Sequence, residues 1–139
     1  LDSVKEWWIM ANPMYGQNKA DDRVAIACDK DVFLKEYTAT ASVGEYSGKY
    51  RVIELNHAST VINITGMHGA DYAGQMVVIV DTSASGTAAH TVTLASGTFD
   101  GTNNKVTLNA PKECIMVFFD SAGNGTIMEN VGSVALASV

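Results

Sequence analysis

Charged side chains are scarce in this chain of 139 residues, and so are cysteine, proline and long apolar runs. Only 17% of the residues are charged, against about 25% in an average soluble domain. A chain with so few charges is expected to hide part of its surface against partners. Its formal net charge of −6 argues against a nucleic-acid binder, which needs excess Lys and Arg to replace phosphate counterions.

The acidic residues are unevenly placed. After residue 57 the only basic residues are Lys105 and Lys112, whereas the same stretch carries six carboxylates. This pattern indicates an acidic, solvated surface, and an electrostatic role against a basic partner is the open alternative.

No membrane-spanning or secretory segment is predicted. The longest apolar run, Cys114–Phe119, is far shorter than the roughly 20 residues that cross a bilayer. The apolar run at residues 7–11 is too short for a signal-peptide core, and no basic region precedes it. Whether the natural start is Leu1 or Met10 stays open. We expect the protein to be made in a reducing cytosol.

The two cysteines, Cys28 and Cys114, have no CxxC spacing and each lies in an apolar, strand-like run. They are predicted to be small buried hydrophobic residues, and a disulfide between them stays open.

Short apolar strands separated by turn residues are what the chain does contain. Val92 and Leu94, and later Val106 and Leu108, alternate with polar residues as in half-buried strands. Gly, Asp, Asn and Pro clusters separate these strands. The continuous apolar run at residues 75–80 predicts a central strand. Further strands are expected at residues 24–27, 32–34, 50–55 and 60–65.

We therefore predict a single all-β domain over residues 23–139. It is expected to be a β-sandwich or jelly-roll-like domain of about eight to ten short antiparallel strands, without an internal repeat. Residues 1–22 are predicted to form an irregular N-terminal arm. Its side chains Trp7, Trp8, Met14 and Tyr15 are costly to leave in water, so they are expected to pack on the domain or on a neighbour.

A search for catalytic chemistry finds little. Asp81, Ser83, Ser85 and His90 lie close together in the sequence, but no G-x-S-x-G elbow accompanies them. We interpret His90 as a hydrogen-bonding residue at the rim of a strand. The sequence predicts no catalytic residue and no cofactor.

No metal site is predicted either. His57 and His68 are isolated from other histidines at ligand spacing. The segment after Asp120 resembles a calcium loop only weakly, because it lacks an oxygen donor at Ala122 and has Val131 where an EF-hand has Glu. A hairpin turn is predicted there.

Three segments resemble small structural proteins of tailed bacteriophages: residues 10–21 (MANPMYGQNKAD), 90–103 (HTVTLASGTFDGTN) and 129–136 (ENVGSVAL). The resemblance is to capsid decoration (cement) and head-fibre proteins, which are small, β-rich and often trimeric. It implies no catalytic residues.

The resemblance implies a structural protein of the virion, not an enzyme, that binds the outer surface of an icosahedral capsid and stabilises it. The expected partners are the major capsid protein and two further copies of this chain. No nucleic acid, membrane or small-molecule ligand is expected. Candidate capsid contacts are Trp7, Trp8, Met14 and Tyr15, and the strand at residues 105–109 offers a face for packing between copies. A head-fibre module that binds a host-surface carbohydrate is the alternative, although few aromatic residues lie in the β region.

Overall fold

The computed structural model describes residues 33–139. The predicted arm at residues 1–22 and the strand expected at residues 24–27 lie outside this range. Within it, ten strands and two short 3-10 helices account for the regular structure, which confirms the all-β prediction. The helices are η1 (Gly44–Tyr46) and η2 (Gly69–Tyr72). The strands are β1 (Leu34–Tyr37), β2 (Ala41–Ser42), β3 (Val52–Leu55), β4 (Asn63–His68), β5 (Met76–Asp81), β6 (His90–Ser96), β7 (Lys105–Leu108), β8 (Cys114–Phe119), β9 (Gly125–Val131) and β10 (Ala135–Ala137).

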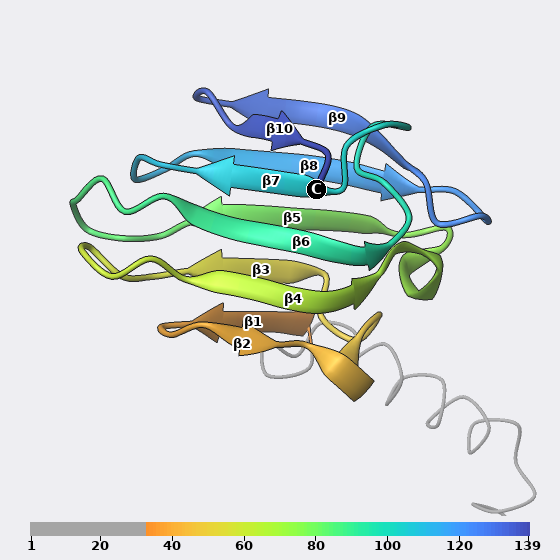
Figure 1. Cartoon of the computed structure of the whole chain (residues 1–139), viewed down its shortest axis with the longest axis horizontal. Helices are drawn as coiled ribbons and strands as arrows, with labels where there is room; N and C mark the ends of the chain where they lie inside the picture. Colours follow the sequence, from red (N-terminus) through yellow and green to blue (C-terminus); the bar gives the residue numbers. More distant parts are fainter. Residues whose placement is uncertain (1–32) are drawn as a thin grey trace, which may run out of the picture.

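The strands form two sheets of five that pack face to face (Figure 1). The first sheet has the order β1-β3-β5-β8-β9, and the second has the order β10-β7-β6-β4-β2. The apolar run that predicted a central strand is β5, which lies in the middle of the first sheet. The sandwich prediction is therefore confirmed.

The prediction of antiparallel pairing throughout is wrong for the first six strands. The chain passes from one sheet to the other after each of β1 to β5. Each strand from β3 to β6 therefore lies beside the strand two places earlier in the chain and runs in the same direction. As a result β1, β3 and β5 pair in parallel, and so do β2, β4 and β6. Antiparallel pairing begins at the β6–β7 hairpin and continues through β8, β9 and β10. These parallel ladders exclude a jelly roll.

The first six strands thus form three successive turns of a flattened coil, a repeat that the sequence did not reveal. Strands β1, β3 and β5 begin at residues 34, 52 and 76, so the interval between turns is uneven. The strand expected at residues 32–34 begins at Leu34, and the one expected at 60–65 runs from Asn63 to His68. Turn residues mark where a strand ends, but they do not specify which sheet receives the next one.

The core lies between the sheets and consists of the inward half of each alternating strand. In the first sheet Ile53, Val77 and Ile115 face inward, and in the second sheet Val92 and Leu108 do so. Complete removal of such a side chain from water contributes about 1.5–3 kcal/mol. Since no α-helix covers either sheet within residues 33–139, each inner face is buried only by the other sheet.

One end of the sandwich is closed by backbone contacts between three glycines. Gly69 begins η2, Gly97 follows β6 and Gly123 lies in the β8–β9 turn. A Cβ atom added at Gly69 or Gly97 would collide with the carbonyl oxygen of Gly123. Gly97 and Gly123 also have φ values of +85° and +84°, a region that side chains disfavour. The three loops can meet this closely only because glycine occupies all three positions.

We expect the Leu108→Ala variant to lose about 2–5 kcal/mol of unfolding free energy, because it leaves a cavity between the two sheets. The Thr107→Ala variant is the matched control, since Thr107 is the neighbouring residue and lies on the outer face of β7. It should change stability by less than about 0.5 kcal/mol. Chemical denaturation of both variants measures the difference, and similar losses in the two would contradict this assignment of the core.

Candidate functional site

The residues that the sequence nominated as capsid contacts, Trp7, Trp8, Met14 and Tyr15, all lie outside residues 33–139. The structure therefore does not test them. Within the described range, two kinds of feature are candidates for function: buried clusters of polar side chains, and the outward faces of the two sheets.

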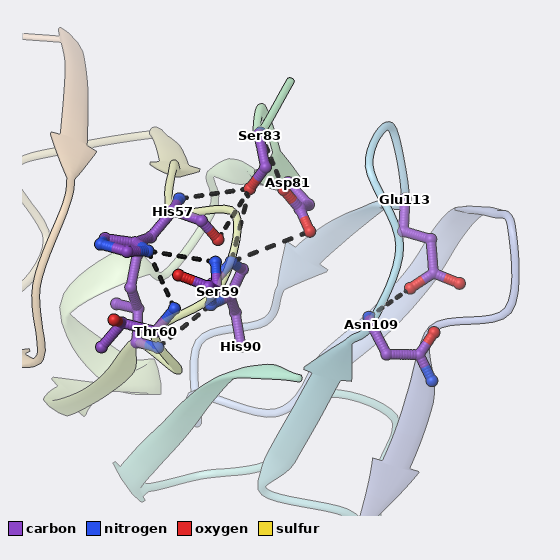
Figure 2. A network of polar contacts seen from close by, with 9 residues as sticks. His57, Ser59, Thr60, Asp81, Ser83, His90, Asn109 and Glu113 are labelled. Atoms are coloured by element: carbon purple, nitrogen blue, oxygen red, sulfur yellow. Dashed lines mark hydrogen bonds and ion pairs between the residues drawn. The ribbon is translucent and has the colours of Figure 1, made fainter. Parts of the chain in front are cut away.

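The largest buried polar cluster joins the loops that follow β3 and β5 (Figure 2). Asp81 ends β5, Ser83 follows it, and His90 begins β6, so three of the four residues singled out in the sequence do meet. His90 Nε2 lies 3.5 Å from Ser83 Oγ and 3.9 Å from Asp81 Oδ2. Ser83 Oγ also accepts a hydrogen bond from the His57 amide at 3.2 Å. Ser85, in contrast, is exposed.

The hydrogen bonds give this cluster the wrong polarity for a serine nucleophile. The buried amide of Ile62 donates to His90 Nδ1 at 3.0 Å, so the ring proton is on Nε2, the nitrogen that faces Ser83. A general base needs a free lone pair at that position. Ser83 and His90 are only 2% and 0% exposed, so a substrate does not reach either side chain. His90 is a hydrogen-bonding residue as predicted, but it lies in the interior and not at the rim.

The cluster instead holds the loop after β3 against the loop after β5. His57 Nδ1 accepts the amides of Ser59 and Thr60 at 3.2 and 2.9 Å, which fixes the turn into β4 (Figure 2). The Ser83 amide donates to Asp81 Oδ1 at 2.9 Å. The buried amides of Ile62 and Ser83 are therefore satisfied by side chains at the points where the chain changes sheets, which avoids the cost of leaving them unpaired.

A buried carboxylate likewise holds two loops together, the one before β8 and the one before β10. Glu113 is 5% exposed, and its two oxygens accept the amides of Asn109 at 2.7 Å and Ser133 at 2.9 Å. Gly132, at φ +87°, lies against this side chain, and a Cβ there would stand 2.6 Å from the Glu113 Cγ atom. Glu113 thus ties the β7–β8 turn to the β9–β10 turn.

The two hairpin turns use their own aspartates. Asp120 Oδ1 accepts the amides of Ala122 and Asn124, each at 2.9 Å, and the predicted hairpin between β8 and β9 is confirmed. In the β6–β7 turn, hydrogen bonds from the Asn103 backbone and side chain hold the pKa of Asp100 below its usual value. No group of three or more potential metal-binding side chains occurs among residues 33–139.

The outward faces of the two sheets differ in chemistry. On the second sheet, Thr91 pairs with Thr107 and Thr93 pairs with Lys105, which is the polar outer face expected of a solvated sheet. On the first sheet, the outward residues of β5 and β8 are all apolar. They form three directly opposed pairs: Met76 with Phe118, Val78 with Met116, and Val80 with Cys114. We call these six residues the apolar face.

Cys114 belongs to this face and is half-buried. The prediction that Cys114 is a buried residue is therefore met only in part, because Ile115 takes the inward place. Partial burial, with the carboxylate of Glu129 nearby, raises the pKa of the Cys114 thiol. Cys28 lies outside residues 33–139, so the question of a disulfide between the two is not settled.

Comparison of the chain with protein-family models, with curated proteins and with solved structures gave no match. In the described part of the chain, no helix has the length and apolar character needed to cross a bilayer.

We expect the His90→Ala variant to lose about 2–4 kcal/mol of unfolding free energy, because the buried Ile62 amide loses its acceptor and a cavity remains. The His68→Ala variant is the matched control. Its imidazole lies at the surface, where Nδ1 and Ser96 Oγ are 3.0 Å apart, and its loss should cost less than about 0.5 kcal/mol. Thermal unfolding measures both. Equal stability of the two variants would show that the cluster does not hold the loops.

Proposed function

We propose that this protein is a structural protein of a bacteriophage virion, which binds the outer surface of an icosahedral capsid and stabilises it. The observation that carries the proposal is the contrast between the buried polar clusters and the apolar face. The polar side chains of the clusters accept hydrogen bonds from the chain's own backbone. The apolar face, in contrast, offers a broad contact surface that has no internal partner among residues 33–139. The resemblance of three segments to capsid decoration proteins supports the same function.

The partners that we propose are the major capsid protein and two further copies of this chain. Closed cyclic symmetry is usual in small homo-oligomers. The arm residues Trp7, Trp8, Met14 and Tyr15 are the proposed capsid contacts. The protein would act by contact, not catalysis, and its place would be the capsid exterior after production in the host cytoplasm.

The β domain supports a structural role more than a carbohydrate-binding one. Three of its aromatic residues, Tyr72, Phe99 and Phe119, are fully buried, and the ring of Phe119 packs on those of Tyr72 and Phe99 with centroids 5.8 and 6.2 Å apart. Of the surface rings, Tyr46 and Tyr50 share the ammonium group of Lys49, which lies 5.0 and 5.5 Å from their centroids. Few aromatic faces are therefore free for a sugar to stack on.

Addition of the purified chain to empty shells of its cognate capsid protein should raise the temperature at which the shells rupture. A protein that binds the assembled shell but not the free subunit stabilises it by about 2.7 kcal/mol when present at 100 times its Kd. Calorimetry of bare and decorated shells, with the bound stoichiometry, measures this effect. Equal melting, together with retention of the chain on a glycan array, would favour the head-fibre alternative.

Replacement of both Trp7 and Trp8 by alanine should weaken attachment to shells by several kcal/mol, while the β domain stays folded. Desolvated aromatic anchors contribute on the order of 2 kcal/mol each at an interface. Replacement of both by phenylalanine is the matched control and should retain most of the affinity. Attachment should fall only modestly at high salt, since apolar burial provides most of it. An unfolded double-alanine variant would instead assign the tryptophans to the domain core.

A further inference from the structure

The apolar face is unusual because apolar residues occupy the solvent side of a sheet whose other side is already buried in the core. The residues that alternate with it, Val77, Ile79, Ile115 and Val117, all lie in the core. The face residues must therefore point away from the sandwich, since successive side chains on a strand alternate between its two sides. Met76 and Phe118 are 38% and 37% exposed, and the other four are partly exposed.

The apolar face continues onto both neighbouring strands. Val52 on β3 pairs with Val78, and Val131 on β9 pairs with Cys114 and is 47% exposed. Carboxylates border this face on both sides. Glu36 and Glu54 oppose each other on β1 and β3, with Glu54 directly beside Val80, and Glu129 on β9 lies beside Met116. An apolar centre with a charged rim is the usual anatomy of a protein interface.

The size of the first sheet suits a second sheet of the same kind. Its five strands are four to seven residues long, and with about 4.8 Å between strands and about 3.3 Å per residue they cover roughly 430 Å². Two such faces in contact bury roughly 900 Å² in total, close to the roughly 1,000 Å² that a specific interface needs, and three around an axis bury about half as much again. Two copies of one chain match each other in width and length without further adjustment.

We propose that the outer face of the first sheet is the interface between copies of this chain, with Met76, Val78, Met116 and Phe118 at its centre. Symmetric contact would cover this face in every copy and leave none exposed. The strand at residues 105–109, which the sequence offered for this role, presents Thr107 and Lys105 to solvent. The first sheet is therefore favoured over the second.

The full-length Met116→Lys variant tests this interface. Residue 116 pairs directly with Glu129 in the register of β8 and β9, and an opposite-charge pair at that position is compatible with the folded sheet. A lysine at the centre of the interface would have to be buried, so we expect self-association at least about 100-fold weaker. Thr107→Lys is the matched control on the outer face of the second sheet and should associate like the parent chain.

Sedimentation equilibrium of all three proteins measures association without any capsid present, so the result does not depend on the capsid-binding proposal. Circular dichroism melting confirms that each variant is folded. If Met116→Lys does not fold, Val78→Thr, which keeps a β-branched side chain, replaces it. Maleimide labelling of Cys114, located by peptide mass mapping to separate it from Cys28, gives an independent reading. We expect Cys114 to be protected in the parent oligomer and reactive in the Met116→Lys variant.

Three results would overturn the proposal. A parent chain that is monomeric with a protected Cys114 would mean that residues 1–32 of the same chain cover the face. A monomer with a reactive Cys114 would mean that the face has no cover in solution. An oligomer that Met116→Lys leaves intact, with Cys114 reactive throughout, would place the interface elsewhere.

Discussion

An inward side chain of either sheet can leave water only against the opposite sheet, because no α-helix covers the inner faces within residues 33–139. Mutual burial of the two sheets is therefore the constraint on which the other features depend. In this chain the first strands pass repeatedly from one sheet to the other, and inward residues such as Ile53 and Ile64 belong to one common core. The parallel ladders of the first six strands follow from these crossings.

Each crossing also creates a structural problem that polar side chains solve. Where the chain changes sheets, backbone amides leave the ladders while still near the interior, and an unpaired buried amide costs about 1–3 kcal/mol. His90 accepts the amide of Ile62, and Glu113 accepts those of Asn109 and Ser133. A set of residues that suggests a hydrolase when read in sequence is thus employed in shaping loops.

Outside these clusters, the clearest difference among the described residues is between the outer faces of the two sheets. The two sheets share a core but differ on their outer sides, since one carries threonine and lysine and the other carries methionine, valine and phenylalanine. The attachment and assembly that we propose for this protein need such a surface. It also needs a rigid support, which the loop clamps and the contact of three glycines provide.

The sequence by itself determined the all-β class, the central position of β5, the hairpin at Asp120 and the alternation of Val92, Leu94, Val106 and Leu108. These are local properties, since they depend on side-chain period and turn residues over a few positions. Only the tertiary structure decided the parallel pairing, the interior position of His90 and the outward position of Cys114. Each of these depends on which strand lies alongside. Local sequence pattern does not specify this pairing, because the paired strands are far apart in the chain and begin at uneven intervals. The continuous apolar runs of β5 and β8 do indicate strands covered on both sides, but only the fold shows which side the second sheet covers and which side stays uncovered by residues 33–139.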